Sequence, residues 1–186
     1  IKTKPLIIYG LAETLESLKE NILNWKVWPD FSELDLINKS GKSIIFTEID
    51  FGDVFEISGL TIEPIKTCHT IASCGYKITK DGRTTIITSD TGPCDEVVRV
   101  VKETKNLKNL VIECAFPSRF KKLAHDSMHL TPLLLEEELK KIGRTDLKIF
   151  INHLKPFYEA EIRSELSAIP LLGSAEVLED GYKIPY

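Results

Sequence analysis

Polar side chains that can bind metal ions or move protons follow three hydrophobic segments of this chain. The β-branched run 84–88 leads to Asp90, and two later hydrophobic runs lead to Glu113 and His153. Short apolar runs of this kind, bounded by turn residues, are typical of buried strands. Because α/β folds place their ligands at the carboxyl ends of strands, these positions suit a binding site. The three residues form one site only if their strands are neighbours in the sheet.

His69 is a fourth candidate, in a short polar segment just before the hairpin that leads to Asp90. Together with Asp90 and His153 it supplies imidazole and carboxylate ligands, which suit zinc, manganese or iron. A single histidine after a strand is more often structural than a ligand. Spacing along the sequence is therefore weak support, and the fold has to bring the three residues together.

His125 and His129 lie four residues apart, the spacing that places two zinc ligands on one face of a metalloprotease helix. We reject that interpretation because Thr131 and Pro132 are typical of the N-cap and first turn of a helix that begins only after His129. His129 is then expected at the entrance of this helix, where the positive end favours an anion. His125 is expected to be exposed.

Hydrophobic periodicity predicts strands that both precede and alternate with helices, which indicates an α/β or α+β class with a mixed sheet. The predicted strands are 5–9, 43–50, 60–66, 75–79, 84–88, 109–112 and 147–152. The predicted helices are 11–24, 94–103, 131–143 and 158–168. Asp81-Gly82 predicts a hairpin turn between two of the strands. We expect an irregular stretch at 114–130 and a closing hairpin formed by 176–178 and 182–184.

Composition excludes some classes of protein. With a formal net charge of -4 the chain lacks the basic balance that a large nucleic-acid surface usually needs. It also lacks an apolar run long enough to cross a membrane. Its four cysteines are irregularly spaced and form no CxxC pair, so we expect free thiols in a reducing compartment, which implies the cytoplasm.

Five motifs occur in one order and resemble those of the class II cyclic-nucleotide phosphodiesterases, a branch of the metallo-β-lactamase fold. The motifs are Thr67-Cys-His-Thr, Thr88-Ser-Asp-Thr-Gly, Ile112-Glu-Cys-Ala-Phe-Pro, His129-Leu-Thr-Pro and Asn152-His-Leu-Lys-Pro. The resemblance covers essentially the whole chain and implies an αββα sandwich with mixed sheets, residues 1–186 being one domain. The family's first motif, His-x-His-x-Asp-His, is absent, so we expect the chain to be the C-terminal portion of a fold truncated at its N-terminus.

The resemblance also implies roles for five residues. His69 is expected to bind one of two divalent metal ions, Asp90 to bridge both, and His153 to bind the other. Zinc is the expected metal, with manganese and iron as alternatives. Glu113 and His129 resemble the Glu and His pair that the related transfer-RNA 3′-processing nucleases use as a proton shuttle.

The function predicted from this resemblance is metal-dependent hydrolysis of a small phosphodiester, cyclic AMP or cyclic GMP. In this interpretation Lys155 offsets the phosphate charge, and the alternative is that it is a solvated surface residue with no role in the site. The aromatic side chains of segment 25–32 either pack this loop onto the core or line the substrate pocket, where one of them, such as Trp28, stacks on a purine. The sequence leaves the oligomeric state open, and a homodimer is compatible with the resemblance.

Two other functions remain as alternatives. One is an RNA 3′-processing endonuclease of the same superfamily, and the other is a non-catalytic scaffold that has lost the first motif. A phosphoacceptor receiver domain with Asp90 as acceptor is rejected, since it needs an acidic pair where the first strand ends in Tyr9-Gly10.

Overall fold

The computed structural model describes residues 3–185. The chain divides into two compact units, Ile1–Asp53 (unit 1) and Val54–Tyr186 (unit 2). That both units belong to a single domain stays a prediction. None of the helices within the described residues is long and apolar enough to span a bilayer.

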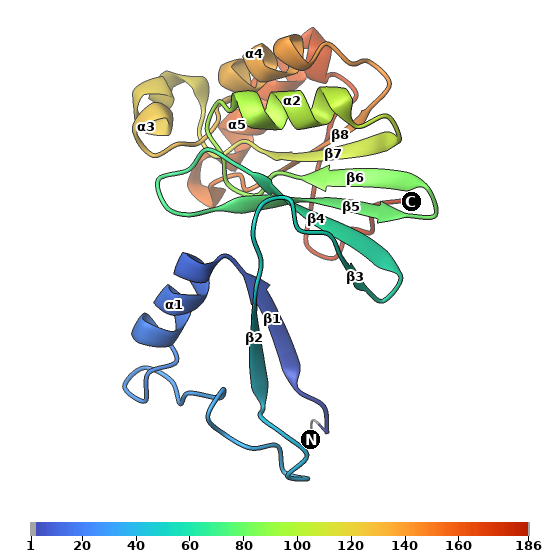
Figure 1. Cartoon of the computed structure of the whole chain (residues 1–186). Helices are drawn as coiled ribbons and strands as arrows, with labels where there is room; N and C mark the ends of the chain where they lie inside the picture. The colour runs from blue at the N-terminus through green and yellow to red at the C-terminus, as the bar shows by residue number, and fades with distance from the viewer. Residues whose placement is uncertain (1–2, 186) are drawn as a thin grey trace. The chain divides into compact units, whose positions relative to one another are not determined.

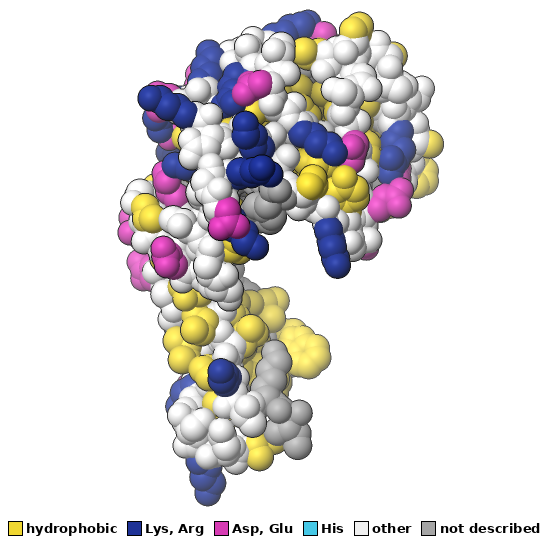
Figure 2. Space-filling model, turned by 90° about the vertical axis from the view of Figure 1, so that its right-hand side faces the viewer, with side chains coloured by type: hydrophobic (Ala, Val, Ile, Leu, Met, Phe, Trp, Pro, Cys, Tyr) yellow, Lys and Arg dark blue, Asp and Glu magenta, His cyan; other side chains and the backbone are white. Residues whose placement is uncertain are grey.

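Unit 1 consists of two strands and one helix. Strand β1, Leu6–Gly10, pairs in parallel with β2, Ile44–Glu48. Helix α1, Ala12–Asn21, lies between these two strands in the chain. These elements confirm the first two predicted strands and the first predicted helix. Trp25 and Trp28 are 57% and 58% exposed, so these two rings do not clamp their loop onto a core as one expectation required. Figure 2 shows hydrophobic side chains gathered on the surface of this unit.

Unit 2 is built on one mixed sheet whose seven strands lie side by side in chain order. The strands are β3 Phe55–Ile57, β4 Leu60–Lys66, β5 Cys74–Lys80, β6 Arg83–Ile87, β7 Leu107–Glu113, β8 Lys148–Asn152 and β9 Glu176–Val177. Strands β3 to β6 pair antiparallel, and β6 to β9 pair in parallel. The carboxyl ends of β6, β7 and β8 therefore lie at the same edge of the sheet, which is the arrangement that the predicted site required.

Three helices of unit 2 lie along one face of this sheet: α2 Asp95–Glu103, α4 Pro132–Ile142 and α5 Glu159–Ala168 (Figure 1). Their apolar stripes pack against the sheet because valine, leucine and isoleucine recur at helical spacing in each. The core combines Val101, Leu135 and Ile162 of the helices with Leu110 and Ile151 of the strands, all nearly inaccessible to water.

Short elements complete unit 2: η1 Ser118–Phe120, α3 Lys121–Asp126, η2 Pro156–Tyr158 and η3 Pro170–Leu172. Local sequence signals account for several of the boundaries. The Thr131 hydroxyl accepts a hydrogen bond from the Leu134 N–H at 3.3 Å and so caps α4, which Gly143 ends at φ +66°. Asp81 and Gly82 form the predicted hairpin turn, with φ of +49° and +74°.

Two expectations about elements are wrong, and one strand was not foreseen. The stretch 114–130 is not wholly irregular, since it contains η1 and α3. Strand β3 was not foreseen, because three residues are too few to show a period. The closing hairpin is absent from the described residues: β9 pairs with β8 instead, and the Tyr182 hydroxyl donates to the Glu176 carboxylate at 2.7 Å outside any ladder.

Candidate metal centre

The site lies at the edge where three parallel strands end. Asp90 follows β6 by three residues, Glu113 is the last residue of β7, and His153 comes directly after β8. The register pairs Glu113 with Asn152, so these two strand ends stand next to each other. The condition set by the sequence, that the strands be neighbours, is met.

A group of three potential metal ligands forms around Asp90. One side-chain donor atom each of His69, Asp90 and His129 lies within 4.8 Å of the others. His69 and Asp90 are half-buried, whereas His129 is buried. The His69 Nδ1 lies 3.0 Å from the backbone carbonyl of Met128, to which it donates. This contact fixes the tautomer and leaves the Nε2 lone pair of His69 available.

His153 lies on the same carboxylate but outside that group of three. Its Nε2 is 3.5 Å from Asp90 Oδ2, and its ring stacks on the His129 ring at a centroid distance of 5.2 Å. The ammonium of Lys155 donates to the same Nε2 at 3.1 Å. The fold thus brings together His69, Asp90, His129 and His153.

Glu113 is the buried partner of His129. Its Oε1 lies 2.6 Å from His129 Nδ1 and accepts the Thr91 N–H at 2.9 Å, and its Oε2 accepts the Leu130 N–H at 3.1 Å. The carboxyl group is fully buried. Three hydrogen bonds therefore fix its orientation, and through it they fix the orientation of the His129 ring.

Burial perturbs the proton affinities of this pair. Removal from water raises the pKa of Glu113 to about 7, although the N–H groups of Leu130 and Thr91 act to lower it. Burial likewise lowers the pKa of His129, against the attraction of Asp90. Because the two groups share one short hydrogen bond, the protonation of one depends on that of the other. A proton added to the pair leaves an N–H at His129 Nε2, the nitrogen that Glu113 does not bind.

Three residues at this edge adopt a backbone conformation that is uncommon outside glycine. Ser89 has φ +55°, Met128 has φ +55° and His153 has φ +62°. The first two directly precede Asp90 and His129. Left-handed residues of this kind are strained and concentrate at functional sites. Here each of them aims a side chain of the site.

Other predicted residues lie apart from this group. His125 is in the last turn of α3 and its side chain is 80% exposed, so it shares no helical face with His129, as expected. Trp28 belongs to unit 1, and its role in substrate binding stays a prediction.

No known family model matches the chain. Two curated relatives are similar to it. One is a probable 3′,5′-cyclic-nucleotide phosphodiesterase of Yersinia pestis, 26% identical over 179 residues that cover 82% of this chain and 50% of the relative. The other is a 3′,5′-cyclic-nucleotide phosphodiesterase of Aliivibrio fischeri, 28% identical over 177 residues, with 80% and 51% covered. The chain spans about half the length of these relatives.

Solved structures settle the fold. The metallo-β-lactamase fold protein YhfI of Bacillus subtilis aligns with a TM-score of 0.68 at 18% identity, covering 96% of this chain and 64% of that one. The short form of human tRNase Z aligns with a TM-score of 0.64 at 15% identity, covering 100% and 70%. The chain has the metallo-β-lactamase fold. The fold class predicted from the motifs is thereby confirmed, as is the resemblance to cyclic-nucleotide phosphodiesterases.

Cysteine pairing in this metallo-β-lactamase fold corrects the sequence prediction. Cys68 and Cys94 form a disulfide with a Cα–Cα distance of 5.5 Å, whereas Cys74 and Cys114 are free. The expectation of four free thiols is wrong because the segment that follows β4 and the N-cap of α2 meet in space. The inference of a reducing compartment loses that support.

Thr91 was also missed as a member of the site. Its N–H binds Glu113, and its hydroxyl accepts the N–H of Cys68, the residue before His69. Its place directly after Asp90 was the only available signal.

Proposed function

We propose that the protein is a metal-dependent hydrolase of small phosphodiesters, with a 3′,5′-cyclic nucleotide as substrate. The observation that carries the proposal is the gathering of three histidines around Asp90 at the carboxyl edge of the sheet: donor atoms of His69, Asp90 and His129 lie within 4.8 Å of one another, and His153 Nε2 lies 3.5 Å from the Asp90 carboxylate. The buried Glu113 behind His129 adds a proton-handling group to the same site.

The donor set fits borderline divalent cations. Imidazole nitrogens and a carboxylate suit zinc, manganese or iron, and the backbone carbonyl on His69 is the kind of outer partner that orients metal-binding histidines. In our assignment His69 and His153 would each hold one ion, and Asp90, whose carboxylate is within 4.8 Å of a His69 donor atom and 3.5 Å from His153 Nε2, would hold both. Two such ions, most naturally zinc, would supply a water of lowered pKa and would polarise the phosphoryl oxygens.

The remaining residues handle the proton and the charge of the substrate. Glu113 holds the Nδ1 edge of His129, so His129 presents Nε2 to the ligand group and can donate a proton to the leaving 3′-oxygen. The Lys155 ammonium, at 3.1 Å from His153, is close enough to the site to offset phosphate charge.

The substrate class rests on the relatives, two of which are described as cyclic-nucleotide phosphodiesterases. The likeness to tRNase Z is one of fold, and precursor transfer RNA is therefore an outcome to be tested. The net charge of -4 favours the small substrate.

The test is steady-state hydrolysis of cyclic AMP and cyclic GMP by the full-length protein with added zinc or manganese, beside precursor transfer RNA. We expect nucleotide turnover that chelation abolishes. Asp90→Asn should lose both bound metal and turnover, whereas His125→Ala, a change to an exposed histidine outside the site, should behave as wild type. Full activity of Asp90→Asn would refute the assignment. Cleavage of RNA alone would move the protein to the nuclease function.

A further inference from the structure

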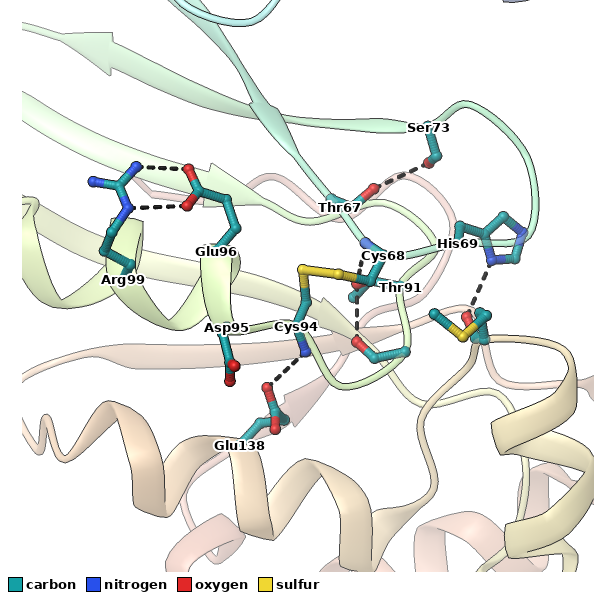
Figure 3. Close-up of a disulfide and its surroundings, with 12 residues drawn as sticks. Thr67, Cys68, His69, Ser73, Thr91, Cys94, Asp95, Glu96, Arg99 and Glu138 are labelled. Carbon is teal, nitrogen blue, oxygen red and sulfur yellow. Dashed lines mark hydrogen bonds and ion pairs between the residues drawn. A yellow bond between two sulfur atoms is a disulfide. The ribbon is translucent and has the colours of Figure 1, made fainter.

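The disulfide joins the two segments that carry His69 and Asp90. Cys68 directly precedes His69, and Cys94 follows Asp90 by four residues and stands at the N-cap of α2 (Figure 3). The two cysteines are 26 residues apart, so the closed loop contains the β5–β6 hairpin with one ligand candidate near each end.

Two hydrogen bonds hold the same segments together. The Cys68 N–H donates to the Thr91 hydroxyl at 3.1 Å, and the Gly92 N–H donates to the Cys68 carbonyl at 2.7 Å. On the other side, the Cys94 N–H donates to the buried carboxylate of Glu138 at 3.0 Å (Figure 3). The disulfide therefore ties the His69 segment to an anchored helix start rather than to a free loop.

One of the two disulfide cysteines is partly exposed to solvent. Cys94 is 2% exposed, but Cys68 is half-buried and lines a surface pocket of about 570 Å³. The other residues lining this pocket are Lys66, Pro93, Asp95, Glu96 and Lys141. Two cations face two carboxylates there, so the pocket favours neither charge and admits an uncharged dithiol. Cys68 is therefore the member of the pair that such a reductant can approach.

We propose that Cys68–Cys94 is a reducible disulfide whose redox state sets the affinity of the neighbouring metal site, an inference that rests on the proposed metal ligands. A thiolate of a dithiol attacks the Cys68 sulfur, and the Cys94 sulfur leaves as a thiolate that takes up a proton. The second thiol of the reductant then displaces Cys68, which is protonated in turn. The protein gains two electrons and two protons, and the dithiol becomes a cyclic disulfide.

Reduction removes the covalent link beside His69 but leaves the hydrogen bonds to Thr91 and Gly92. Without the disulfide the segments that carry His69 and Asp90 are freer to move, and a metal ion that binds both residues has to order these segments. Couplings between sites typically change affinity by about 5- to 150-fold. Because the hydrogen bonds persist, we expect the lower part of that range, an affinity for zinc about tenfold weaker in the reduced protein.

Linkage makes the effect reciprocal. If zinc binds the oxidised form about tenfold more tightly, zinc lowers the reduction potential of the disulfide by about 30 mV, since tenfold in a two-electron equilibrium corresponds to that value. The reduction potential is measured on the wild-type protein, so this test does not depend on the folding of a variant.

The experiment measures zinc affinity by competition with a chromophoric chelator, on oxidised protein and on protein reduced with dithiothreitol that is removed under anaerobic conditions. Counting thiols after denaturation should give two in the first sample and four in the second. Cys68→Ser/Cys94→Ser should bind zinc as the reduced protein does and ignore dithiothreitol. Cys74→Ser, which removes a free cysteine outside the disulfide, should respond as wild type.

Equal zinc affinity of the oxidised and reduced proteins would overturn the inference, as would a reduction potential that zinc does not shift. Four thiols in protein kept under air would overturn it too. None of these measurements involves hydrolysis, so the coupling can fail while phosphodiesterase activity stands, and activity can fail while the coupling stands.

Discussion

Gly75 places β5 unusually close to the strand that leads to Asp90. A Cβ added at Gly75 would lie 2.6 Å from the Ile87 carbonyl oxygen and 2.9 Å from that of Thr88. Its φ lies outside the left-handed region, so alanine is compatible with the local backbone. The effect of Gly75→Ala is therefore steric, and it acts on backbone atoms that have no rotamer to change.

The cost follows from that geometry. Strands β5 and β6 have to move apart, and forced overpacking typically costs about 1–3 kcal/mol. A loss of about 2 kcal/mol lowers Tm by roughly 4–8 °C for a chain of this size. Since Ile87 and Thr88 lead directly into the segment of Asp90, the same displacement should weaken zinc binding. The assays are thermal unfolding of the metal-free protein by circular dichroism and chelator competition.

Gly173 provides a matched control. It has helical dihedrals, φ -60° and ψ -20°, and an added Cβ would meet only the Pro170 carbonyl oxygen, at 3.4 Å. Gly173→Ala should change stability by less than about 0.5 kcal/mol or raise it by up to about 1 kcal/mol. If Gly75→Ala unfolds within about 0.5 kcal/mol of wild type, on the scale of ordinary surface changes, the steric argument for the β5–β6 spacing is refuted.

Two further predictions concern the proton-handling pair. His129→Ala should lower kcat by about 10²- to 10⁴-fold while its zinc content stays at the wild-type value. His69→Ala, in contrast, should lose zinc. Equal loss of zinc in both variants would show that His129 is a metal ligand. Because burial raises the pKa of Glu113 to about 7, the Glu113–His129 pair holds its extra proton below that pH and releases it above. Proton donation, and with it kcat, should fall as pH rises through about 7, and a kcat that is constant from pH 6 to 8.5 contradicts this role.

The strand ends of the site could be predicted from the sequence because their signals are local. The β-branched run before Asp90 and the apolar runs before Glu113 and His153 each show a strand and the polar residue that ends it. Thr131 and Gly143 likewise mark the two ends of α4 by their own chemistry. The connections between the strands decide that these three are parallel neighbours. The sequence shows those connections only through its resemblance to a known fold.

The disulfide could not be predicted for the same reason. Cys68 lies two residues after β4 and Cys94 is the N-cap of α2, and they meet at a Cα–Cα distance of 5.5 Å only after the β5–β6 hairpin has returned the chain. Irregular spacing carries no pairing signal. The closing hairpin failed in a different way, since Asp180-Gly181 does form a turn, with φ +85° at Gly181, but β8 offers Glu176 and Val177 a better ladder.

The division of roles among the histidines depends on what each second nitrogen binds. Glu113 fixes Nδ1 of His129 in a buried, three-bonded arrangement, which suits a group that must hold a proton at Nε2. His153 differs, because an ammonium already donates to its Nε2 at 3.1 Å and that nitrogen is therefore an acceptor with its lone pair toward the site. A metal ion and the Lys155 ammonium cannot both use this lone pair. If His153 holds a cation as proposed, Lys155 would be displaced from it, and its ammonium would be available to the phosphate of the substrate, which joins the two roles proposed for this segment.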